Sequence, residues 1–178
     1  MYPLAAWAAA RGMAGLSVQY RRYKPNTLNT VFETVKDARS AMRYLRCHAA
    51  ELGVDPERLV AIGSSAGGHL AIATALFDGV DEKDESTGIT TRPAAVIMLS
   101  PVIDTSVAGY GQAKLGELWR ELSPLHQVRP GLLPMLSFHG TRDETTPFAG
   151  AQAFHEAMLK AGNRCDFVVG PGGGMSTR

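Results

Sequence analysis

Apolar and polar residues alternate in blocks along the whole chain, and these blocks predict helices and strands in turn. The clearest block is 31–52, where apolar residues recur at spacings of three and four and line one face of a helix. Thr30 and Glu33 have the spacing of a capping box at its start, and Gly53 suits the left-handed position that ends a helix. The apolar stripe consists of Val31, Val35, Ala38, Met42, Leu45, Ala49 and Leu52.

Short apolar runs predict β-strands between the helices. The first run has the period-two alternation of a half-buried strand, and the second is continuous, which is typical of a buried parallel strand. Strands are expected at 16–20, 58–63, 94–99, 135–138 and 165–169, and further helices at 4–11, 66–77 and 147–161, the last with Thr146 as N-cap. This alternation implies right-handed parallel crossovers, hence a three-layer αβα sandwich around a mostly parallel sheet of about five strands.

The length of 178 residues is consistent with one domain, 1–178, because a chain of this size buries most of its surface on folding. The one long excursion, 100–130, is expected to be a long loop or a cap-like insertion. A loop of this length beside a strand end often shapes a binding site, but a surface insertion without a catalytic role fits equally well.

Charge and cysteine content exclude several classes of function. A net charge of +1 gives no general attraction to nucleic acid or to an anionic membrane. The acidic run 81–85 is interpreted most simply as a solvated loop. Cys47 and Cys165 form neither a disulfide framework nor a zinc-ligand spacing. No metal or organic cofactor is therefore expected.

The first ten residues are apolar but lack the basic flank and cleavage-site residues of a signal peptide, so they are interpreted as a helix. No apolar stretch of the sequence is long enough to span a bilayer. The compartment stays open, with a cytoplasmic or a secreted parent both possible.

The strongest chemical signal is Gly63-Ser64-Ser65-Ala66-Gly67, a G-x-S-x-G motif between a predicted strand and a predicted helix. Such a turn forces the central serine into a strained conformation and projects its hydroxyl above the sheet. Ser65 is therefore the candidate nucleophile, and the amide of Ala66, at the helix N-terminus, is the candidate oxyanion donor. A glycine-rich packing turn or a weak phosphate loop are the alternatives, but a phosphate loop favours a lysine or a G-x-G-x-x-G pattern.

A serine nucleophile needs a base, and the base needs an acid that orients it. Asp143 follows the strand at 135–138 and lies on the same sheet edge as the motif, so it is the candidate acid. A solvated turn aspartate is the alternative interpretation, and Glu144 and Asp104 are rivals, the latter one strand too early.

Three segments of the chain resemble the acetyl esterase/lipase-like branch of the α/β-hydrolases. They are GSSAGGHLA, Asp55-Pro56-Glu57-Arg58 and HGTRDETTPF. Tyr20-Arg21, Asp37 and Ser123-Pro124-Leu125 also fall where that branch has recurrent features. The resemblance covers about residues 4–174 and implies a hydrolase of short acyl or acetyl esters, with acetylated carbohydrate among the substrates of the branch.

Two features of that branch are absent from the sequence: a catalytic histidine after the glycine-rich turn at 172–174, and a His-Gly-Gly strand before the first helix. We therefore expect a chain truncated at both ends, without a triad histidine. His69 and His139 resemble packing histidines of the branch, and a surrogate base would have to come within about 3 Å of the serine hydroxyl.

Without the His-Gly-Gly strand, the predicted strands 16–20 and 58–63 would pair directly, be separated by a gap, or accept a strand from another chain. An exposed sheet edge of this kind predicts lower stability and self-association. For function, the sequence favours a carboxylic ester hydrolase acting through an acyl-enzyme. A catalytically inactive fragment and a peptidase of the same fold are the alternatives.

Overall fold

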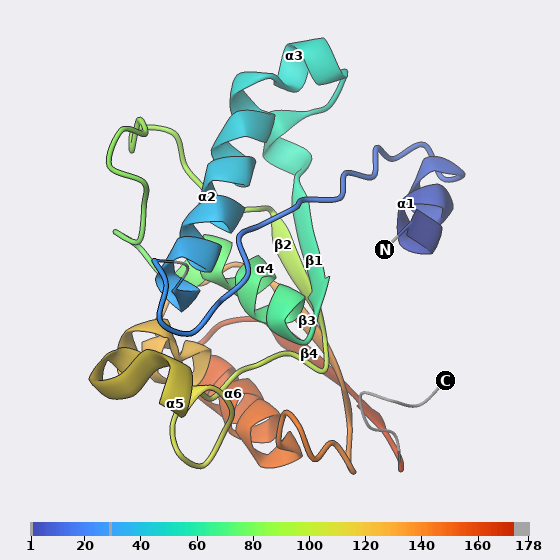
Figure 1. The fold of residues 1–178 in the computed structure, drawn as a ribbon. Coiled ribbons are helices and arrows are strands. Elements are labelled where there is room, and N and C mark those ends of the chain that lie inside the picture. Colours follow the sequence, from blue (N-terminus) through green and yellow to red (C-terminus); the bar gives the residue numbers. More distant parts are fainter. Residues whose placement is uncertain (1, 29, 173–178) are drawn as a thin grey trace.

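A parallel β-sheet forms the centre of the computed structural model, which describes residues 2–28 and 30–172 (Figure 1). Among these residues the sheet has four strands in the order β1-β2-β3-β4, all parallel. They are β1 (Val60–Ser64), β2 (Ala95–Leu99), β3 (Met135–Gly140) and β4 (Cys165–Gly170). The expected α/β class is confirmed, with four strands in place of five.

Helices connect the strands and fill the excursion after β2. The α-helices are α1 (Tyr2–Ala9), α2 (Val31–Cys47), α3 (Ala49–Leu52), α4 (Ala66–Leu76), α5 (Gln112–Leu115) and α6 (Phe148–Lys160). The 3₁₀ turns are η1 (Pro56–Arg58), η2 (Gly116–Leu122) and η3 (Pro124–Gln127). The segment 100–130 is thus a loop that contains several short helical turns.

The core lies on one face of the sheet, against α2, α4 and α6. Alternate strand residues such as Val96, Met98 and Met135 are fully buried there, and they join Ile72 of α4 and Phe154 of α6 in one cluster. Helix α1 lies on the other side of the sheet in Figure 1. The strand positions between the buried ones are only partly covered, and Val60 and Val168 are about half exposed.

The predicted strand at 16–20 is wrong: this segment is extended but belongs to no sheet, and every one of its residues is exposed. A period-two pattern yields a strand only when another strand supplies hydrogen-bond partners, and none of the described residues does so here. Arg21, directly after it, is instead fixed to α2 by hydrogen bonds to Asp37 at 2.7–3.1 Å and to the Glu33 carboxylate at 2.7 Å.

The long helix predicted at 31–52 is divided at His48 into α2 and α3. Thr30 caps it as expected, since its hydroxyl accepts from the amide of Glu33 at 3.4 Å. The Glu33 carboxylate does not complete the box, because it pairs with Arg21 and Lys36. Gly53 ends α3 in the predicted left-handed conformation, with φ 65°.

The acidic run 81–85 is not simply solvated. Asp81 accepts from two buried arginines of α2, Arg39 and Arg43, at 2.7 Å each, and Glu85 accepts from Arg43 at 2.7 Å. The run therefore neutralises charges that α2 carries into the protein interior, which the sequence pattern alone did not indicate. No helix in the described part of the chain is long and apolar enough to cross a membrane.

Candidate active site

Ser65 lies at the turn between β1 and α4 with φ 55° and ψ −121°. A non-glycine residue with positive φ is strained, and among the described residues Asn26 and Ser100 are the only others. The amide of Ser65 donates to the carbonyl of Leu99 at 3.0 Å, and its carbonyl accepts from the amides of His69 and Val102. Its hydroxyl makes no capping bond to α4. The predicted strained turn is present, and the serine oxygen is not used to cap the helix.

Two glycines around the serine permit the turn. They are Gly63 and Gly68, whereas the motif itself contains Gly63 and Gly67. A Cβ on Gly63 would lie 2.1 Å from the carbonyl oxygen of Gly67, and one on Gly68 would lie 2.8 Å from Cβ of Pro101. A Cβ on Gly67 would meet nothing within 4 Å. A side chain at position 67 would thus meet no neighbour, and it is the backbone of Gly67 that excludes a side chain at position 63.

Ala66 is the first residue of α4, so its amide has no acceptor within the helix. The positive end of the helix dipole lies at the same place. This amide therefore has no acceptor of its own among the described residues and lies next to Ser65.

Asp143 is buried in the turn after β3. Its Oδ1 accepts from the amides of Thr145 and Thr146 at 3.0 and 2.9 Å, whereas Oδ2 is buried and accepts no hydrogen bond from the described residues. Burial raises the pKa of this carboxyl, but the amide and hydroxyl of Thr146, the amide of Thr145 and the hydroxyl of Ser100 outweigh it, so the pKa is lowered. Asp143 is thus a charged carboxylate with one oxygen free to accept from an imidazole.

The two rival acids have other environments. Glu144 is exposed, so it lacks the burial that would direct a carboxylate at a base. Asp104 follows β2, and its Oδ1 accepts from the amide of Ser106 at 2.8 Å, closing a local turn. The geometry therefore favours Asp143 over both.

Ser65 and Asp143 follow β1 and β3, which flank β2 in the sheet. Two inter-strand spacings amount to about 10 Å between the strand ends. A ring that hydrogen-bonds to both side chains fits such a span, which is the arrangement of a Ser-His-Asp triad.

The histidines of the chain are engaged elsewhere. His69 contacts the carbonyl of Leu122 at 2.7 Å, and burial lowers its pKa although that hydrogen bond opposes the shift. His139 contacts the carbonyl of Thr146 at 2.8 Å, and His126 contacts the hydroxyl of Ser123 at 2.8 Å. His48 and His155 contact Tyr44 and Phe167. None of the described residues places an imidazole in a hydrogen bond to Ser65 or to Asp143.

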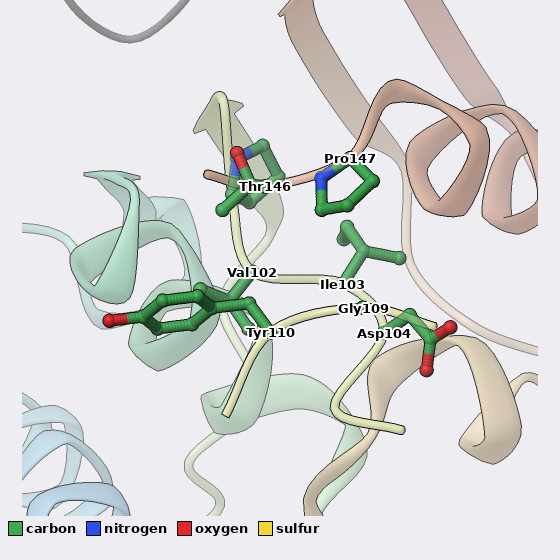
Figure 2. Close-up of a pocket in the computed structure, with 8 residues that line it drawn as sticks. Val102, Ile103, Asp104, Gly109, Tyr110, Thr146 and Pro147 are labelled. Carbon is green, nitrogen blue, oxygen red and sulfur yellow. The ribbon is translucent and has the colours of Figure 1, made fainter. Parts of the chain in front are cut away.

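A small hollow of about 10 Å³ lies between the segments that follow β2 and β3 (Figure 2). It has room for roughly one water-sized group. Val102, whose amide donates to the carbonyl of Ser65, is one of its walls, and Thr146 is another. The other lining residues are Pro101, Ile103, Asp104, Gly109, Tyr110 and Pro147. In the described part of the chain, no group of three or more His, Cys, Asp or Glu side chains is arranged to hold a metal ion.

A parallel sheet with helices, and a strained serine at a strand-turn-helix junction, define an α/β-hydrolase fold. The BD-FAE family model matches residues 1–158, and the chain belongs to this family. The structure is similar to that of Thermogutta terrifontis esterase 2 phosphoramylated by tabun, with a TM-score of 0.90 and 41% identity. A propionate-bound structure of the same esterase gives a TM-score of 0.88 and 40% identity.

Two curated proteins are similar in sequence. One is "Probable isoprenylcysteine alpha-carbonyl methylesterase ICMEL1" of Oryza sativa subsp. japonica, 28% identical over 90% of this chain. The other is "Endo-1,4-beta-xylanase B" of Butyrivibrio fibrisolvens, 33% identical over 53% of this chain. The chain spans 43% of the rice protein, 15% of the xylanase and 66% of the tabun-modified Thermogutta esterase.

Proposed function

We propose that the protein is a carboxylic ester hydrolase in which Ser65 is the nucleophile and Asp143 the acid. The observation that carries the proposal is the conformation of Ser65, a serine held at φ 55° between a buried strand and a helix. The buried, unpaired Oδ2 of Asp143 supports it, because such an oxygen is satisfied by the N–H of an imidazole. The esterase names of the relatives support the same reaction.

In the proposed reaction, the hydroxyl oxygen of Ser65 attacks the acyl carbonyl while an imidazole accepts the hydroxyl proton. The amide of Ala66 donates to the oxyanion. The imidazole then protonates the leaving alcohol, and water releases the acid from the acyl-enzyme. None of the five histidines of the sequence is hydrogen-bonded to Ser65 or to Asp143, so we propose that a segment outside residues 1–178 supplies this imidazole. Without it, the oxyanion donor and substrate binding still support residual hydrolysis, which is the activity measured below.

Short acyl groups are the proposed substrates. The esterase of Thermogutta terrifontis is known with propionate and with butyrate bound, which supports a short acyl group. For the alcohol part, similarity to a xylanase supports an acetylated carbohydrate. A small soluble ester such as 4-nitrophenyl acetate is therefore a suitable test substrate.

The assignment can be tested by covalent labelling. The full chain is incubated with a fluorophosphonate, and the adduct is mapped by peptide mass spectrometry. We expect one adduct, on Ser65, because a strained, half-buried serine beside an oxyanion donor is the most reactive hydroxyl. Ser65→Ala should abolish both the adduct and the hydrolysis of 4-nitrophenyl acetate.

Ser64→Ala is the matched control, since Ser64 is the exposed neighbouring serine on the last position of β1. It should retain the adduct. An adduct elsewhere with Ser65 unmodified, or hydrolysis unchanged in Ser65→Ala, would refute the assignment.

We also propose that the chain self-associates through the β1 edge of its sheet. Within the described residues β1 pairs with β2 alone, so the backbone groups along its other edge are open to another strand. Val60, at the start of this strand, is 51% exposed, and an exposed apolar edge favours association.

A further inference from the structure

Thr146 is almost fully buried and makes hydrogen bonds through three different atoms. Its amide donates to Oδ1 of Asp143 at 2.9 Å, and its carbonyl contacts Nε2 of His139 at 2.8 Å. Its hydroxyl donates to the carbonyl of Ser100 at 3.3 Å. Thr146 therefore joins the Asp143 turn, the inner strand β3 and the end of β2.

The hydroxyl of Thr146 does not have the role that the sequence predicts for it. Threonine before a Pro at the start of a helix is expected to be the N-cap. In the structure α6 begins at Phe148, its N-cap is Pro147, and no side chain caps it. The predicted N-cap is wrong because the hydroxyl donates across the sheet edge to Ser100 instead.

Ser100, which receives this bond, is a strained residue with φ 42°. Its neighbours hold the Ser65 turn: the carbonyl of Leu99 accepts from the amide of Ser65, and the amide of Val102 donates to the carbonyl of Ser65. Strain at a non-glycine residue persists only where surrounding contacts enforce it. A continuous series of contacts thus runs from Asp143 through Thr146 and the Ser100 segment to Ser65.

We propose that Thr146 is a positioning residue, whose hydroxyl bond to Ser100 fixes the Asp143 turn relative to the Ser65 turn. This inference rests on the proposed function, since it assigns Thr146 to the same site. Thr146 touches no reacting atom; it acts through the carboxylate and through the backbone that carries the serine.

Electrostatics at Asp143 agree with this geometry. The amide of Thr146, which donates to Oδ1, is the group that most lowers the pKa of Asp143 against the effect of burial. The titratable group that faces the carboxylate is His139, whose Nε2 lies 3.8 Å from Oδ2. Loss of the hydroxyl bond to Ser100 loosens the turn that presents the Thr146 amide to the carboxylate, and should therefore raise the pKa of Asp143.

The test compares Thr146→Val, which keeps the shape and the backbone groups but removes the hydroxyl, with Thr146→Ser, which retains it. The readouts are kcat and KM for 4-nitrophenyl acetate, the pKa of Asp143 from carboxyl ¹³C NMR, and the melting temperature. We expect Thr146→Val to lower kcat about five- to tenfold, the equivalent of one lost hydrogen bond, with little change in KM. It should also raise the pKa of Asp143, and Thr146→Ser should restore both values.

Thr91→Val is the matched control. Thr91 is equally buried, and its hydroxyl donates to the carbonyl of Thr74 at 2.8 Å, away from the site. This variant should lose stability but keep kcat and the pKa of Asp143. If Thr146→Val behaves in the same way, the residue is merely structural and the proposal is overturned. Thr146→Ala provides the same readouts if the valine variant does not fold.

The experiments distinguish failure of the proposed function from failure of the inference on Thr146. Hydrolysis that survives Ser65→Ala would refute the esterase assignment without reference to Thr146. In that case the NMR measurement decides alone: an unchanged pKa of Asp143 in Thr146→Val overturns the inference, and a raised pKa supports it.

Discussion

Two glycines at equal distance from Ser65 have different roles. The space at Gly63 is filled by the backbone of the first turn of α4, whereas the space at Gly67 opens away from neighbouring atoms. The close approach of strand and helix, which bends the chain sharply at the serine, thus depends on the glycine before Ser65 and on Gly68 after it. The motif alone does not distinguish these positions.

A pair of substitutions tests this difference. Gly63→Ala should lower the free energy of unfolding by about 3 kcal/mol or more, because its Cβ would collide with backbone that cannot move aside. Gly67→Ala should leave it unchanged or raise it by up to about 1 kcal/mol, because alanine favours the helix. Urea unfolding of both variants provides the measurement. Equal losses at the two positions would contradict the assignment.

Among the elements, helix α2 depends most on ion pairs. Arg39 and Arg43 are buried on its inner side and share Asp81, which the loop after α4 supplies. Charges in the interior are tolerated only when they are paired and hydrogen-bonded. The helix and this loop therefore stabilise each other, although they are distant in sequence.

Removal of the shared carboxylate should be costly. Asp81→Asn removes the one carboxylate that pairs with the buried Arg39 among the described residues, and leaves Arg43 paired with Glu85 alone, so we expect a loss of about 3 kcal/mol in the free energy of unfolding. Asp166→Asn makes the same change in the exposed pair with Arg164 and should cost no more than about 1 kcal/mol. Thermal and urea unfolding would show the difference, and similar losses in both variants would count against a buried network.

For the whole molecule, the sheet has one protected face and, among the described residues, two open edges, β1 and β4. The buried face carries the core, but the other face holds half-exposed apolar side chains, among them Val60 on β1. Apolar surface beside an unpaired strand edge favours contact with a second chain. This arrangement supports the proposed self-association.

A charge at the edge should prevent this contact. Val60→Lys is expected to reduce the mass seen by light scattering after size exclusion toward the 19.0 kDa of one chain, because lysine on an edge strand opposes pairing. Val107→Lys, at a site that is 92% exposed in the excursion after β2, should have no such effect. A wild-type chain that is monomeric at every concentration would exclude the association.

Much of the fold was predictable, because the relevant signals are local. The 3.6-residue periodicity of α2, the apolar runs of β1 to β4 and the glycine-serine motif are short-range patterns, and each produced the expected element. The same holds for the left-handed Gly53. Asp143 could be proposed as the acid because the order of elements places successive strand ends on one edge of a parallel sheet.

Contacts between distant segments could not be predicted from the sequence. These contacts decided the features of the fold that differ from the prediction. Residues 16–20 have the alternation of a strand, but pairing requires a neighbour that only the fold can supply. The hydroxyl of Thr146 was expected to cap α6, yet the end of β2 offered it the carbonyl of Ser100. The sequence alone determined which local conformations are favourable; the tertiary structure determined which hydrogen-bond partners are within reach, since a donor bonds to whatever acceptor the packed chain brings to about 3 Å.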